Sequence, residues 1–95
     1  MALLQCRVAK GAMAHERSLI VEGATQEYES WADSRGVQLL EGEDEGRLET
    51  SEARGLVPVR VVERDANRQL VLVELPEEVI MGSRRVWVHA GKVRE

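Results

Sequence analysis

The stretch "LVPVRVVERDANRQLVLVEL", residues 56–75, carries the clearest structural signal in this chain. Two runs rich in Val and Leu flank the polar residues 65–68, an arrangement that predicts a β-hairpin. In the first run Val57, Val59 and Val61 share one face, which is the period of two expected of a strand. The sequence therefore predicts two antiparallel strands joined by a polar turn.

The two strands of this hairpin differ in character. Residues 70–75 are apolar on both faces, so we expect a central strand that ends at Pro76. Pro58 has no N–H group to donate to a sheet, so it should lie near the start of its strand or on a sheet edge. We expect the second strand to be the better covered of the two.

Other short segments have the same strand character. They are "LLQCRVA" (3–9), "SLIVEG" (18–23), "TQEYESWAD" (25–33), "VWVHA" (86–90) and a short last strand in "GKVRE" (91–95). Residues 77–85 form a brief excursion before the strand at 86–90. Helical periodicity is absent over any long window, so the predicted fold class is all-β or mainly β.

The chain divides into two β-rich parts. Residues 41–55 are acidic and punctuated by Gly, with no core-forming pattern, and predict an exposed loop between a first half at 1–40 and a second half at 56–95. A short helical turn around "RLETSEAR" (47–54) would shorten this connection. Because so short a chain rarely supports two independent cores, we expect one domain spanning 1–95.

The segment "EGEDEGRLETSE", residues 41–52, matches the acidic spacing of a calcium-binding loop, with Gly46 at the sixth position. Its early ligands are all Glu, whereas the tight first half of such a loop requires the shorter Asp or Asn. The flanking segments favour strands instead of helices. We therefore interpret the segment as a solvated acidic loop and predict no metal site.

The only two Trp residues occur in similar settings, "SWADSRGV" (30–37) and "VWVHAGKV" (86–93). Each Trp is followed six residues later by Val, as a duplicated small barrel or a barrel with pseudo-twofold symmetry would produce. We expect Trp31 and Trp87 each to lie in the core, where a Trp commonly closes one end of a small barrel because it buries a large area. The alternative is an exposed binding platform.

Short, strongly bent strands over residues 56–94 resemble SH3-like barrels, and the "RRVWV" strand at 84–88 resembles that of small uncharacterised bacterial proteins. The resemblance implies either one small SH3-like barrel or two packed β-rich halves, and a binding role without a defined ligand. Peptide-binding SH3 domains line their grooves with several aromatic residues, whereas this chain has only Tyr28 and the two Trp residues. Recognition of proline-rich peptides is not expected.

Composition places the chain among globular proteins, with 43% hydrophobic and 32% charged residues and no Phe. Apolar runs are too short to cross a bilayer, and the first residues do not form a leader peptide, so we expect a cytoplasmic protein without membrane contact. The single Cys6 cannot form an internal disulfide. We expect it to be a buried, inert thiol.

Charge and chemistry exclude several activities. Residues 1–55 carry six basic and eleven acidic groups, and residues 56–95 carry seven and six, so neither half has a dense basic surface for general nucleic-acid binding. His15 and His89 lack neighbouring nucleophiles, and their wide spacing from Cys6 does not form a zinc site. No phosphate-binding loop is present. We predict no catalytic site and no cofactor.

Three functional hypotheses remain. The first is a non-catalytic interaction module that self-associates, most simply as a twofold dimer. The second is a nucleic-acid-binding module, and the third is a small-ligand or enzyme site at a subunit interface. The predicted binding residues are Trp87, Arg84, Arg85 and Arg60, joined by Arg64 and Lys92 in the nucleic-acid hypothesis.

Overall fold

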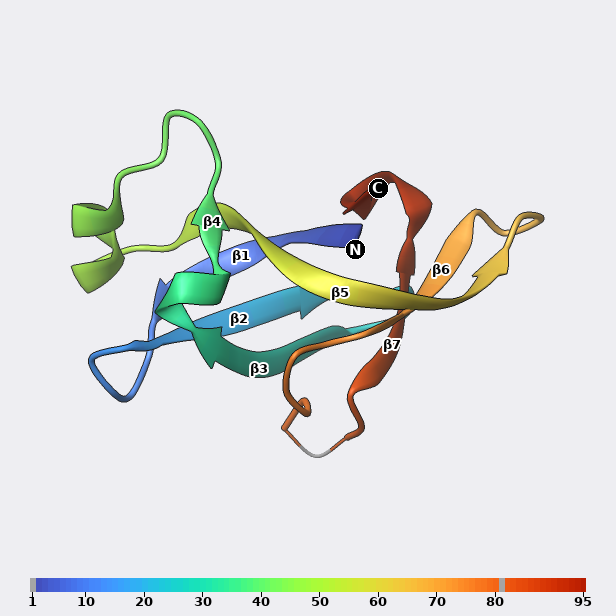
Figure 1. Ribbon diagram of the computed structural model, residues 1–95, viewed down its shortest axis with the longest axis horizontal. Helices are drawn as coiled ribbons and strands as arrows, with labels where there is room; N and C mark the ends of the chain where they lie inside the picture. Colours follow the sequence, from blue (N-terminus) through green and yellow to red (C-terminus); the bar gives the residue numbers. More distant parts are fainter. Residues whose placement is uncertain (1, 81) are drawn as a thin grey trace.

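The computed structural model describes residues 2–80 and 82–95 and is mainly β, as the sequence predicts (Figure 1). The strands are β1 (Ala2–Lys10), β2 (Glu16–Glu22), β3 (Glu27–Asp33), β4 (Gln38–Leu39), β5 (Ala53–Asp65), β6 (Leu70–Glu74), β7 (Arg85–His89) and β8 (Val93–Arg94). Three short 3₁₀ helices connect them, namely η1 (Ser34–Gly36), η2 (Glu45–Glu49) and η3 (Ala90–Lys92). None of the helices described is long and apolar enough to cross a membrane.

The strands form one curled antiparallel sheet in the order β3-β2-β1-β5-β6-β7, shaped as a half-barrel. The short strand β4 pairs with β5, and β8 pairs with β1. The predicted hairpin is confirmed, since β5 turns at residues 66–69 and pairs with β6. β6 lies between β5 and β7, which agrees with its apolar character on both faces. Met81, within the predicted excursion at 77–85, lies outside the described residues.

The two halves, β1 to β4 and β5 to β8, repeat the same order of elements. Each has a long strand, a hairpin whose second strand carries the Trp, a 3₁₀ helix and a two-residue strand. That last strand pairs with the long strand of the other half. The residues before the 3₁₀ helices also match, with φ and ψ of −64° and 136° at Asp33 and −68° and 139° at His89.

Strand registers show which positions of the two halves are equivalent. In the first half Val8 lies opposite Leu19, and Leu19 lies opposite the residue before Trp31. In the second half Val61 lies opposite Val73, and Val73 lies opposite the residue before Trp87. Val8 and Val61 therefore occupy equivalent positions on the two long strands.

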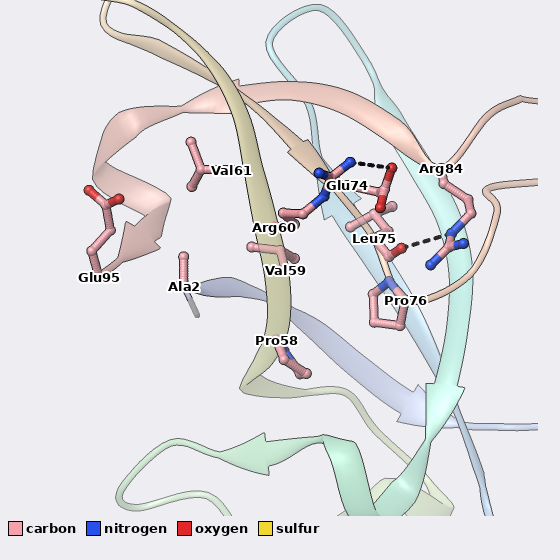
Figure 2. A pocket seen from close by; sticks show the side chains of 10 residues that line it. All are labelled: Ala2, Pro58, Val59, Arg60, Val61, Glu74, Leu75, Pro76, Arg84 and Glu95. Atoms are coloured by element: carbon pink, nitrogen blue, oxygen red, sulfur yellow. Dashed lines mark hydrogen bonds and ion pairs between the residues drawn. The ribbon is translucent and has the colours of Figure 1, made fainter.

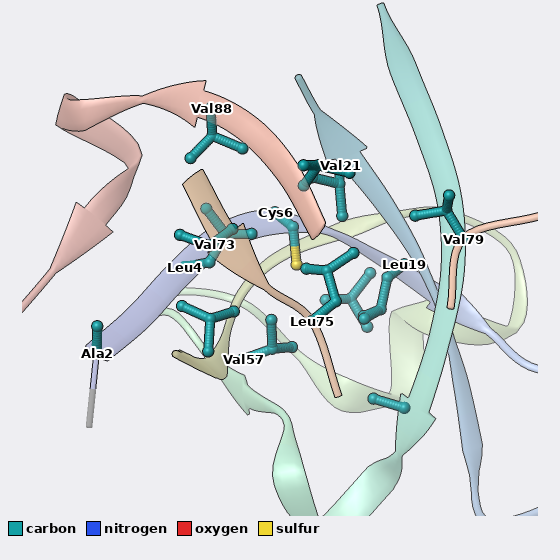
Figure 3. Close-up of a cluster of buried hydrophobic side chains, with 14 of the residues drawn as sticks. Ala2, Leu4, Cys6, Leu19, Val21, Val57, Val73, Leu75, Val79 and Val88 are labelled. Atoms are coloured by element: carbon teal, nitrogen blue, oxygen red, sulfur yellow. The ribbon is translucent and has the colours of Figure 1, made fainter. Parts of the chain in front are cut away.

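The core is aliphatic and lies on the concave side of the sheet (Figure 3). Its largest fully buried side chains are Leu4, Leu19, Leu75, Val8, Val21, Val57, Val73 and Val88. Cys6 is buried among them, as predicted, and this burial raises the pKa of its thiol to about 12. A thiol with so high a pKa stays protonated at neutral pH.

The prediction that both Trp residues close the core is wrong. Trp31 is 42% exposed, and Trp87 is half-buried outside the core cluster. The reason is strand alternation, because Val86 and Val88 point into the core and Trp87 between them must point to the other face. The same alternation buries Ser30 and Ala32 and turns Trp31 outward.

The acidic segment is more ordered than a solvated loop. β5 already begins at Ala53, so the last three residues of the predicted loop belong to a strand. Within residues 41–52, here named the acidic strap, η2 places Leu48 in the hydrophobic core with only 6% of its surface exposed. In Figure 1 the strap lies at one end of the long axis of the molecule.

Four glutamates of the strap form ion pairs with basic side chains on β1, β2 and β5. The pairs are Glu43–Arg54 at 3.7 Å, Glu45–Arg17 at 2.7 Å, Glu49–Lys10 at 3.0 Å and Glu52–Arg7 at 3.1 Å. Exposed ion pairs of this kind contribute only a few tenths of a kcal/mol each, on the order of 0.2–1. Leu48 is therefore the principal anchor of the strap, and the ion pairs set its position.

Candidate binding groove

A groove of about 610 Å³ opens beside β5, where the sheet splits. β4 pairs with β5 only at Gly55 and Leu56, and β6 pairs with it from Arg60 onward, so Pro58 lies in the gap. Because Pro58 has no backbone N–H, the gap leaves no unsatisfied backbone donor at this residue. The groove is lined by Ala2, Pro58, Val59, Arg60, Val61, Glu74, Leu75, Pro76, Arg84 and Glu95 (Figure 2).

The floor of the groove is apolar and partly open. Val61 packs against the edge of the core but is only half-buried, and Pro76, which follows the buried Leu75, is half-buried too. The equivalent residue in the first half, Val8, is 0% exposed. The same position is thus fully covered in one half and accessible in the other.

Two arginines at the groove share one carboxylate. The Arg60 Nη2 and Arg85 Nε groups both donate to Glu74 Oε2, each at 3.2 Å. These hydrogen bonds, with that from Arg60 the larger influence, lower the pKa of the Glu74 carboxyl. Two guanidinium groups therefore face a single carboxylate, and the cluster keeps a positive charge.

Arg84 adds a further cation at the rim. Its Nε donates to the carbonyl oxygen of Leu75 at 3.1 Å, and the Leu75 N–H donates to the Arg84 carbonyl at 2.7 Å. Among residues 2–80 and 82–95, Arg84 has no carboxylate within ion-pair distance, and its side chain is exposed. It is held at its Nε, and its two Nη groups carry further N–H donors (Figure 2).

A second, smaller pocket of about 330 Å³ lies around Trp87. It is lined by Ala24, Thr25, Tyr28, Asp65, Arg68, Leu70, Arg85, Val86 and Trp87. The Ala24 N–H donates to the Trp87 carbonyl at 2.8 Å, which fastens the β2–β3 turn to β7. This contact brings one aromatic residue from each half, Tyr28 and Trp87, to the same pocket.

The predicted binding residues are divided between the groove and the second pocket. Arg60 and Arg84 line the groove, whereas Trp87 and Arg85 line the second pocket, and Glu74 connects Arg60 with Arg85. Sequence reasoning missed the apolar floor, because Val61 has the pattern of an ordinary core residue. The one available signal was Pro58, a residue without an N–H inside a strand.

Comparison of the chain with protein-family models, with curated proteins and with solved structures found no match. The groove itself combines an aliphatic floor with guanidinium groups at its rim. Such a surface holds an aliphatic side chain by removing it from water and a neighbouring carboxylate by charge-assisted hydrogen bonds. The ionisable side chains among the described residues that line it are Arg60, Arg84, Glu74 and Glu95.

Proposed function

We propose that this protein is a non-catalytic interaction module of the cytoplasm that associates with a second copy of itself through the groove. The observation that carries the proposal is the half-buried Val61 beside the open groove, at the position where the first half buries Val8 completely. Covering an accessible aliphatic floor is the usual driving force of association. The single buried thiol, Cys6, supports a reducing compartment.

Charge supports the choice of a second copy as the partner. The groove carries Arg60 and Arg84, and Arg60 and Arg85 share Glu74, while the β6–β7 connection carries the carboxylates of Glu77 and Glu78. The basic groups at the groove of one copy are therefore complementary to the acidic β6–β7 connection of another, which favours and orients the encounter. Twofold dimers are the commonest arrangement for such contacts.

Light scattering after size-exclusion chromatography tests the proposal. From micromolar to millimolar concentration, the mass should rise from the 10.7 kDa of one chain toward twice that value. Pro76→Asp places a charge on the groove floor, at a residue that has no N–H to lose, and should keep the protein monomeric. Ala66→Asp, the same charge change in the exposed β5–β6 turn, should leave association intact. A wild-type mass of one chain at every concentration would contradict the proposal.

The pocket around Trp87 supports a second candidate function, binding of single-stranded nucleic acid. Trp87 and Tyr28 offer aromatic surfaces, and Arg68 and Arg85 lie at the same pocket. Titration of the Trp31→Phe variant with a short oligothymidylate tests this, since Trp87 is then the only Trp. Quenching that weakens with added salt would favour this function, and unchanged fluorescence would eliminate it.

A further inference from the structure

We infer that the groove of one copy receives the exposed Ile80 of a second copy, with Glu78 of that copy pairing with Arg84. The inference rests on the proposed function and specifies which surface of the partner enters the groove. In this contact Ile80 packs on the apolar floor of the groove. The Glu78 carboxylate pairs with Arg84, which has no ion-pair partner among the described residues of its own chain.

Ile80 is the most exposed of the large hydrophobic residues described, at 64%. Its backbone is nevertheless fixed, because the Ile80 N–H donates to the Glu29 carbonyl of β3 at 2.7 Å. The Ser30 hydroxyl bonds to the carbonyl oxygens of Glu77 and Glu78 at 3.2 and 3.0 Å. This stretch is therefore attached to the sheet while the Ile80 side chain points to solvent, so docking it costs little additional order.

The chain already uses this chemistry internally. In the acidic strap, Leu48 enters the core while Glu45 and Glu49, on either side of it, pair with Arg17 and Lys10. An aliphatic residue flanked by glutamates thus docks on an apolar surface with a basic margin. Glu78 and Ile80 present the same combination, two residues apart.

The acidic strap and the groove have ion pairs at equivalent positions. Lys10 and Arg64 occupy equivalent positions on the two long strands. Lys10 lies opposite Arg17, which lies opposite the residue after Trp31. Arg64 lies opposite Val71, which lies opposite the residue after Trp87. Lys10 pairs with Glu49 of the strap, whereas Arg64 pairs with Glu95 beside the groove. Both halves therefore have an ion pair at this position, but Leu48 next to Glu49 is buried in the core, whereas Val61 at the groove is only half-buried.

A twofold axis allows both copies to form the same contact at once. Residues 75, 76 and 84 line the groove, and Ile80 lies between them in the same β6–β7 connection. A twofold axis beside this connection places each Ile80 against the groove of the other copy, which gives a closed, isologous contact. The arrangement accounts for association into dimers instead of filaments.

The first test compares two exposed hydrophobic residues. Ile80→Asp should raise the dimer dissociation constant by at least about tenfold, because it removes the anchor and places a charge against an apolar floor. Met13→Asp is the matched control, since Met13 is 60% exposed and lies in the β1–β2 connection away from the groove. It should leave the dissociation constant unchanged. Thermal melts at low concentration verify that both variants are folded.

The second test exchanges the charges of the inferred pair. Arg84→Glu and Glu78→Arg alone should each weaken the dimer about tenfold, because each places like charges together. The double variant should recover the wild-type dissociation constant to within about threefold, which a merely structural role of either residue would not produce. Analytical ultracentrifugation measures all four proteins.

The outcomes separate the two proposals. A monomeric wild-type protein removes both the proposed function and this inference. A dimer that Pro76→Asp dissociates, but that tolerates Ile80→Asp and shows no recovery in the charge exchange, keeps the groove as the interface and overturns Ile80 as its occupant. Loss of the dimer with Ile80→Asp, together with recovery in the double variant, supports the inference.

Discussion

The two halves of this protein have the same order of elements but differ in what covers their long strands. In the first half, the acidic strap lies beside β1 and places Leu48 in the core, and Val8 is completely buried. In the second half, the equivalent Val61 is half-buried beside an open groove. The two copies of a repeated arrangement of strands can therefore differ in how far the long strand is covered.

The comparison also explains the distribution of charge. The excess of acid in the first half lies largely in the strap, where it is compensated by Arg7, Lys10, Arg17 and Arg54. In the second half, Arg84 at the groove remains without an ion pair in the described part of the chain. An arginine without a described ion pair and a half-buried aliphatic floor thus lie at the same groove.

The largest expected effect comes from removing the anchor of the strap. Leu48→Ala should lower the free energy of unfolding by about 2 to 4 kcal/mol, as for other buried Leu residues. Urea denaturation measures the change, with Arg47→Ala at the neighbouring exposed position as a control expected to stay within about 0.5 kcal/mol. If Leu48→Ala is as mild as the control, the strap does not depend on its anchor and the contrast between the halves loses its basis.

A matched pair of substitutions addresses the long strands themselves. Val8→Ala should cost about 2 kcal/mol, because it deletes two methyl groups at a site with no exposed surface. Val61→Ala should cost less than about 1 kcal/mol when measured at concentrations where the protein is monomeric. Equal losses in urea denaturation would mean that the groove position is as well covered as its equivalent.

The smallest expected effect is the pH dependence of the 3₁₀ helices η1 and η3, which precede the last strand of each half. The side chain of Asp33 accepts hydrogen bonds from the side chain and the backbone N–H of Arg35, which lower its pKa to about 2, whereas His89 at the equivalent position makes no side-chain capping bond. Because the folded pKa is below the ordinary value, the stabilisation is present above about pH 4 and is lost as the pH falls toward 2.

Arg35→Ala should accordingly raise the pKa of Asp33 toward the ordinary value. An NMR titration of the Asp33 carboxyl carbon measures this shift. In the same titration, acid should perturb the amides of η1 before those of η3. An unchanged pKa in the variant would show that the Arg35 side chain does not hold the carboxylate.

Strand periodicity in the sequence predicted most of the sheet. The hairpin of residues 56–75 and the strand containing Leu4, Cys6 and Val8 were identified because polar and apolar residues alternate there. The same reasoning failed at Trp87, because both faces of "VWVH" and of its neighbour β6 carry large apolar residues. The burial of Val86 and Val88 in the folded protein shows that the Val side faces the core.

Three features that shape the candidate site have no periodic signal. The last strand was predicted within residues 91–95, where β8 lies, but the pairing of the two-residue strands β4 and β8 with the long strand of the other half joins distant parts of the chain and was not. Leu48 is a single apolar residue among acidic ones, so nothing in its surroundings indicates an anchor. The groove depends on the gap beside Pro58, which exists only once β4 and β6 are placed.

A dilution series followed by two-dimensional NMR tests the central claim, that the second half is an interface and the first half is closed by its strap. As the protein is diluted from millimolar to micromolar concentration, the amides of Arg60, Val61 and Ile80 should shift together along one binding curve. The amides of Val8 and Leu48 should stay in place. Shifts confined to the first half, or no concentration dependence anywhere, would contradict the account.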